Sequence, residues 1–110
     1  MPTSAKVSLP PVTENRTAAA FLQALGEPTR LNIVRLLSAG PSNVTEIATA
    51  LQTEIVNTSH HLGVMRSAGV LQDRKDGRFV IYSLACEYKT TTESVTLTGP
   101  GVKVVVNLIS

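Results

Sequence analysis

The chain has 110 residues, 43% hydrophobic and 4% aromatic, which suffices for one compact domain with an aliphatic core. Its 10 basic and 8 acidic residues give a net charge of +2, which permits a polyanionic partner without requiring one. So few aromatic rings argue against a surface that stacks the bases of single-stranded nucleic acid. No apolar run is long enough to cross a bilayer or to form a signal peptide, and a single cysteine suits a reducing compartment. We therefore expect a cytoplasmic protein.

The N-terminal part of the chain predicts a leader followed by two helices. Residues 1–13 are rich in proline, serine and threonine and predict a flexible leader. From Glu14 onward, apolar residues recur at the spacing of a helix: Ala18, Phe21, Leu22 and Leu25. Gly26 ends this helix, and Pro28 suits the first turn of a second helix, where its missing N–H costs nothing.

Two shorter helices are expected next. Asn43 and Glu46 have the spacing of a capping box at the start of a third helix, about Val44–Leu51. After a short turn, Thr53 can cap a fourth helix, Thr53–Ala68. One face of this fourth helix should pack inward: Ile55, Thr58, Leu62 and Met65.

Beyond residue 69 the apolar pattern changes to the alternation of strands. A basic hairpin is expected over Leu71–Leu84, with Asp76 and Gly77 at its turn. A second hairpin is expected near the C-terminus, because alternating segments flank Gly99-Pro100-Gly101.

Two helices joined by a short turn and followed by a basic hairpin predict a winged helix-turn-helix of the α+β class. It has N-terminal helices, a β-hairpin wing and an extra C-terminal β-hairpin. The DNA-binding domain covers residues 14–88, and residues 89–110 extend it and offer a dimer contact. In such a fold the fourth helix enters the major groove of B-DNA, while the wing clamps the backbone. Nine residues are expected to contact DNA: Val56, Asn57, Ser59, His60, Gly63, Arg66, Arg74, Lys75 and Arg78.

The types of these residues indicate their roles. Val56 can touch a thymine methyl group, and Ser59 and His60 can form hydrogen bonds with base edges or phosphates. Gly63 lets the DNA backbone come close. The basic side chains of the wing suit phosphate contact or the neighbouring minor groove.

Three segments together resemble the ArsR/SmtB family of bacterial and archaeal repressors. They are Ala24–Leu31 (ALGEPTRL), Ser59–Leu62 (SHHL) and Arg74–Arg78 (RKDGR). The resemblance implies a homodimer that binds double-stranded DNA at a pseudo-palindromic operator and blocks transcription. Many members of this family release DNA when they bind a metal ion, so the resemblance raises the question of a metal site.

Several departures from the family pattern bear on metal and dimer formation. Metal-sensing members carry cysteines at the start of the third helix, where this chain has Asn43 and Thr45. A second family site uses aspartate and histidine on a C-terminal helix, but this chain has no histidine after His61. We therefore expect no metal at these sites and no cofactor, and the inducer stays unknown. The family's C-terminal helix forms the dimer with the first helix, whereas strands are predicted here.

Other function classes are weighed against DNA binding. An enzyme is not expected, because no carboxylate pair stands near a histidine and no glycine-rich phosphate loop follows a strand. The alternative is a winged-helix module for protein interaction or dimerisation with reduced or no DNA binding. The weak polarity at Ile55, Val56 and Gly63 favours this alternative. Cys86 is either a bystander thiol or a redox or ligand sensor.

Overall fold

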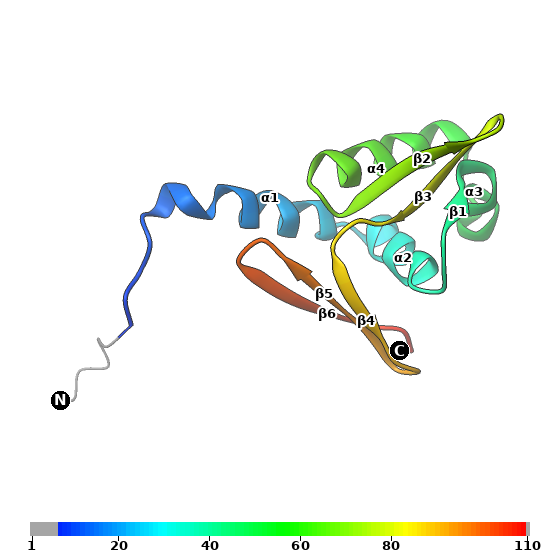
Figure 1. Cartoon of the computed structure of the whole chain (residues 1–110). Helices are drawn as coiled ribbons and strands as arrows, with labels where there is room; N and C mark the ends of the chain where they lie inside the picture. The colour runs from blue at the N-terminus through cyan, green and yellow to red at the C-terminus, as the bar shows by residue number, and fades with distance from the viewer. Residues whose placement is uncertain (1–6, 110) are drawn as a thin grey trace.

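The computed structural model describes residues 7–109, which form helices and two separate antiparallel sheets (Figure 1). The elements in chain order are the 3-10 helix η1 (Val12–Asn15), α1 (Arg16–Leu25), α2 (Pro28–Leu37), β1 (Ser42–Asn43), α3 (Val44–Leu51), α4 (Ile55–Ser67), β2 (Leu71–Asp76), β3 (Phe79–Leu84), β4 (Glu87–Thr90), β5 (Ser94–Gly99) and β6 (Val102–Asn107). This is the predicted winged helix-turn-helix of the α+β class with extra C-terminal strands. Within the described residues, no helix is long and apolar enough to span a membrane.

The predicted leader, residues 1–13, is described only in part. Residues 1–6 lie outside the described residues, and residues 7–11 form neither helix nor strand. The last two residues of the predicted leader already belong to η1, so helical structure begins slightly earlier than Glu14.

α1 and α2 begin and end where local chemistry dictates. α1 buries Phe21, Ala24 and Leu25, but Leu22, predicted on the same stripe, is 45% exposed. Phe21, Ala24 and Leu25 form the buried stripe, and Leu22 lies about 100° from Phe21 around the helix, at the edge of that stripe. The carboxylate of Glu27 caps α2 by accepting a hydrogen bond of 2.8 Å from the backbone N–H of Arg30.

α3 has the predicted bounds and the predicted capping box. Asn43 Oδ1 accepts from the Glu46 backbone N–H at 2.8 Å, and Glu46 Oε1 accepts from the Asn43 N–H at 3.0 Å. The prediction for the next cap was wrong, because the N-cap of α4 is Glu54 and not Thr53. α4 is consequently shorter at both ends than the predicted Thr53–Ala68.

The wing is a hairpin of β2 and β3, with β1 on the other side of β3. Asp76 pairs with Phe79, so the loop is Gly77-Arg78, one residue later than the predicted turn. Gly77 has φ 64°, whereas φ of Arg78 is not positive, which is the pattern of a type II′ turn. The observed register places Leu71 opposite Leu84, and both side chains are buried. This buried pair fixes the register and brings Arg78 to the tip of the wing.

The second hairpin is confirmed, and a strand that was not predicted joins it. β5 and β6 pair across the loop Pro100-Gly101, and β4 pairs with the other side of β5. β4 has only four residues, all exposed, so no apolar alternation marks it in the sequence. This strand crosses residue 88, the end of the predicted DNA-binding domain.

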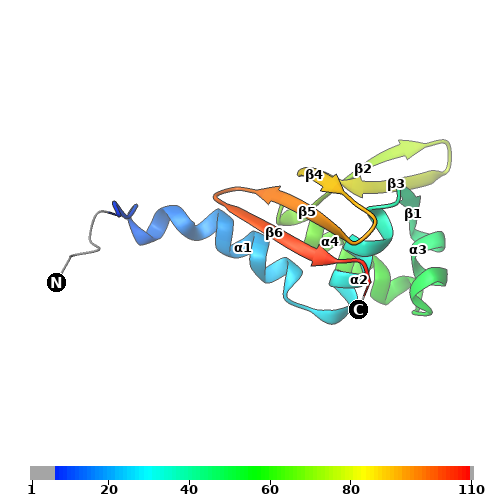
Figure 2. The same ribbon diagram turned by 90° about the horizontal axis from the view of Figure 1, so that it is seen from below.

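The C-terminal sheet packs against both N-terminal helices, since Gly99 lies against Phe21 of α1 and Arg35 Nε of α2 donates to the Asn107 backbone oxygen at 2.8 Å. Both views show this sheet lying beside α1 (Figures 1 and 2). A Cβ atom on Gly99 would lie only 2.7 Å from Cε2 of Phe21, so a larger residue would push the Phe21 ring aside. The buried Phe21, Val95 and Leu97 belong to the same core as the residues of the winged helix. The sheet is therefore part of one folded unit with the helices.

Candidate nucleic-acid interface

The burial pattern of α4 decides which of its side chains face outward. Thr58, Leu62 and Met65 are fully buried, as predicted. The opposite face is exposed and carries four residues that were expected to contact DNA: Val56, Asn57, Ser59 and His60. Ile55 was predicted to pack inward, but it is 50% exposed. It lies in the first turn of the helix, where no neighbouring element covers it fully.

The start of α4 is fixed by a buried hydroxyl group. Thr58 Oγ1 donates to the backbone oxygen of Glu54 at 3.0 Å and lies 2.8 Å from Thr53 Oγ1. A buried hydroxyl without partners would be costly, so these contacts stabilise the turn that leads into the helix. They set the position of the exposed residues that follow.

A polar cluster joins α1, α2 and α4. Arg30 Nε donates to the backbone oxygen of Ala24 at 2.7 Å, and Arg30 Nη1 lies 3.3 Å from His61 Nδ1. His61 Nε2 lies 3.9 Å from Glu27 Oε2. The hydrogen bond from the Arg30 backbone N–H holds the pKa of the Glu27 carboxyl below its usual value. His61 is thus a half-buried packing residue that helps to orient α4.

Sequence reasoning did not assign this cluster a role. Glu27 and Arg30 are three positions apart, which is the spacing of a helix N-cap and the residue whose backbone N–H it accepts. This spacing could have predicted the cap of α2 from the sequence. The partner His61 is 31 positions further along the chain, and only the packing of α4 on α2 brings it close.

Some of the basic residues near the wing form ion pairs with acidic side chains, and others do not. Arg66 of α4 forms an ion pair of 3.0 Å with Asp73 of β2, and Arg74 lies 3.9 Å from Asp76. Within residues 7–109, no acidic side chain lies within ion-pair distance of Lys75 or Arg78. These two exposed charges are therefore the best placed to attract an anion.

The two sides of the wing differ as well. Side chains alternate along a strand, so Lys75 shares a face of β2 with Asp73, which contacts α4. Arg74 points to the opposite face. Asn43, Thr45, Ser59, Arg78 and Tyr82 are among the residues that line a groove between α3, α4 and the wing. The structure thus brings Ser59 and Arg78 to one surface.

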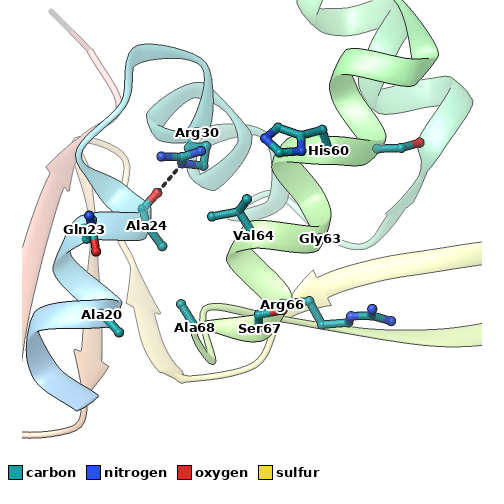
Figure 3. A pocket seen from close by; sticks show the side chains of 11 residues that line it. Ala20, Gln23, Ala24, Arg30, His60, Gly63, Val64, Arg66, Ser67 and Ala68 are labelled. Carbon is teal, nitrogen blue, oxygen red and sulfur yellow. Dashed lines mark hydrogen bonds between the residues drawn. The ribbon is translucent and has the colours of Figure 1, made fainter. Parts of the chain in front are cut away.

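A second groove, of about 740 Å³, lies between α1 and α4 (Figure 3). Small side chains form much of its walls: Ala20, Ala24, Gly63 and Ala68. Arg30 and His60 lie at one end of it, and Arg66 extends away from α1 (Figure 3). His60 and Gly63 are therefore reachable from the groove as well as from the outer face of α4.

Gly63 is open enough for a side chain, and replacing it should stabilise the fold. A Cβ atom there would have no neighbour within 4 Å, and the residue is in the interior of a helix. We expect Gly63→Ala to raise the free energy of unfolding by about 0.5–1 kcal/mol, measured by urea denaturation. Gly77→Ala is the matched control, because Gly77 is equally uncrowded but has φ 64°. It should destabilise the protein, and a gain from both variants would contradict this explanation.

Comparison with known proteins identifies the family. A family model described as "Bacterial regulatory protein, arsR family" matches residues 27–73, from the cap of α2 into β2. The transcriptional repressor SdpR of Bacillus subtilis is 36% identical over 62 residues, which cover 56% of this chain and 69% of SdpR. The chain belongs to the ArsR family.

Other relatives agree with this assignment. The HTH-type transcriptional regulator NmtR of Mycobacterium tuberculosis is 42% identical over 66 residues, or 60% of this ArsR-family chain, but the match spans only 55% of NmtR. The NMR structure of Mb0332 from Mycobacterium bovis, a homodimeric winged helix-turn-helix DNA-binding domain, has a TM-score of 0.66 and 30% identity. It covers 74% of this chain and 75% of that one. HlyU from Vibrio cholerae has a TM-score of 0.64 and 27% identity, covering 68% and 82% of the two chains.

The residues of this ArsR-family chain do not fit a transition metal at the start of α3. Asn43 uses its side chain in the capping box, and Asn43 and Thr45 offer no thiolate or imidazole ligand. Among residues 7–109, no group of three or more His, Cys, Asp or Glu side chains could hold a metal ion. Cys86, in the link between β3 and β4, is half-buried, and this burial raises the pKa of its thiol. A thiol with a raised pKa is a poor nucleophile at neutral pH.

Proposed function

We propose that this ArsR-family chain is a sequence-specific DNA-binding transcriptional regulator that acts as a homodimeric repressor without the family's usual metal sites. The main support is the exposed face of α4, which stands beside Lys75 and Arg78, two basic wing residues with no acidic partner among residues 7–109. The names of SdpR and NmtR, a repressor and a regulator, agree with the proposal. Such a protein would act in the cytoplasm, on the chromosome.

In this proposal α4 enters the major groove and the wing lies along the backbone. Val56, Asn57, Ser59 and His60 read base edges, and Gly63 allows close approach. Lys75 and Arg78 contact phosphates. Arg66 and Arg74 would first loosen their ion pairs with Asp73 and Asp76, so we assign them a smaller part.

The proposed dimer uses α1 and the C-terminal sheet. Val12, Leu22 and Val105 are exposed large apolar residues outside the winged helix, and β6 pairs with a neighbour only along its β5 side among the described strands. Such an apolar flank suits association with a second copy. Two-fold symmetry would then place two α4 helices on a pseudo-palindromic operator.

The proposal can be tested by titrating a fluorescent fragment of the protein's own promoter at several salt concentrations, against random DNA of equal length. Binding of the promoter that exceeds random DNA by about a thousandfold or more would establish a sequence-specific regulator. If the promoter fragment and random DNA bind equally and with a steep salt dependence, the protein binds DNA without sequence specificity at this promoter. No binding at low salt would contradict the proposal and favour a protein-interaction module.

His60→Ala is expected to relax sequence preference. If the imidazole contacts a base, its loss should cost about 1–3 kcal/mol on the operator and little on random DNA. The measurement is the ratio of the two dissociation constants at one salt concentration. Equal losses on both DNAs would show that His60 binds phosphate and does not read a base.

A further inference from the structure

The first turn of α4 presents an unusual pair of side chains. Ile55 is 50% exposed and Val56 is 79% exposed. Both are aliphatic, and neither can form a hydrogen bond through its side chain. The outward residues of the next turn, Ser59 and His60, are polar. Val56 therefore lies on the outward face with Ser59 and His60, whereas Ile55 lies close in angle to the buried Leu62 and is half exposed because the helix begins there.

The charges around this pair restrict its occupant. Lys75 and Arg78 stand on the neighbouring wing without acidic partners among residues 7–109, and Ser59 and Arg78 line the same groove. A partner that satisfies these cations is anionic, yet it must also offer apolar groups to Ile55 and Val56. The major groove of DNA has both properties, because phosphates flank it and the C5 methyl of thymine is the apolar group on its base edges.

We propose that Ile55 and Val56 read thymine methyl groups, so that each operator half-site requires thymines at two defined positions. This inference rests on the proposed DNA-binding function. The two side chains lie about 100° apart around the helix, so they reach different base pairs. Around the helix axis, Ser59 lies at an angle between those of Ile55 and Val56, about one turn further toward the C-terminus of α4. Its hydroxyl would therefore face base pairs next to the two contacted thymines.

The size of the effect follows from the area removed from water. Burying one methyl-sized group is worth about 0.8 kcal/mol, which is a factor of about four in the dissociation constant. Removing one contacted methyl from each half-site of a palindrome should therefore weaken binding about fifteenfold. Removing a thymine methyl elsewhere should leave the affinity unchanged.

The experiment uses the full chain and DNA that it selects itself. The most tightly bound duplex is recovered from a random-sequence library and resynthesised with deoxyuridine in place of one thymidine per half-site, position by position. Deoxyuridine keeps the base pair and removes only the methyl group. Fluorescence anisotropy gives the dissociation constants, and two sensitive positions per half-site are expected.

Variants connect each sensitive position to a residue. For each of the variants Ile55→Ala and Val56→Ala, one of the two thymine positions should lose its effect, so that the duplexes with thymidine and with deoxyuridine there bind equally. At the other position, deoxyuridine should still weaken binding. Val7→Ala, an exposed valine in the segment before η1, is the matched control and should behave as the wild type. Circular dichroism checks that each variant is folded.

The outcomes separate this inference from the function on which it rests. A selected sequence that tolerates deoxyuridine at every position would overturn methyl reading and leave sequence-specific binding intact. Sensitivity that persists in both alanine variants would assign the methyl contacts to other residues and also overturn the inference. Failure to select any sequence would overturn the proposed function, and methyl reading with it.

Discussion

Phe21→Ala is expected to lower the free energy of unfolding by about 3–5 kcal/mol, the largest loss of stability that one substitution should cause. Phe21 is fully buried, and its ring lies against Gly99, where even a Cβ atom would not fit. Alanine would leave a cavity at the junction of α1 and the C-terminal sheet. A domain of this size has a stability of only about 5–15 kcal/mol, so the loss is a large fraction of the total.

Urea denaturation followed by circular dichroism measures this change. Phe79→Ala is the matched control, because Phe79 is 50% exposed near the tip of the wing and should cost less than about 1 kcal/mol. Similar losses from both variants would show that the ring of Phe21 does not hold the sheet against α1. Hydrogen exchange adds a local measure, since β5 and β6 should lose protection first.

The double variant Lys75→Ala/Arg78→Ala is expected to give the largest loss of DNA affinity. A dimer would lose four phosphate contacts, which should lower the slope of log K against log salt by about 3.6. At 1 M salt screening removes most of the difference, so at 0.1 M salt the binding constant of the variant should be lower by roughly three and a half orders of magnitude. Operator and random DNA should be affected alike, because phosphates carry no sequence information.

The control is Lys89→Ala/Lys103→Ala, which removes two exposed charges of the C-terminal sheet. The net charge of this variant equals that of the wing variant, so a general electrostatic effect would lower both affinities equally. An unchanged salt slope in the wing variant would refute phosphate contact by the wing.

Local signals in the sequence were sufficient for much of the fold. The capping box of Asn43 and Glu46 predicted the start of α3, and alternation around Pro100-Gly101 predicted the second hairpin. Both signals lie within a few residues of the structure that they specify. β4 has no such signal, because its polar residues form a strand only by pairing with β5.

The candidate site was predictable in part. The inward face of α4 followed from spacing at Thr58, Leu62 and Met65, but spacing alone could not show that Ile55 is exposed. That depends on where the helix begins, which the Thr58 hydroxyl and the backbone of Glu54 determine. The ion pair between Arg66 and Asp73 was also hidden, since it depends on the packing of β2 beside α4. The roles of individual residues in DNA contact stay predictions.

The C-terminal sheet is contiguous in sequence, because its strands follow one another from Glu87 to Asn107 and pair only among themselves. It is attached to the helices by the contact of Gly99 with Phe21 and by the hydrogen bond from Arg35 to the Asn107 backbone oxygen, while the wing takes its register from Leu71 and Leu84. Exchange of residues 87–107 for another structural element that covers Phe21 would therefore leave the proposed DNA-facing helix and the wing in register. In evolution, such an arrangement would let the proposed assembly surface and the proposed reading surface change independently.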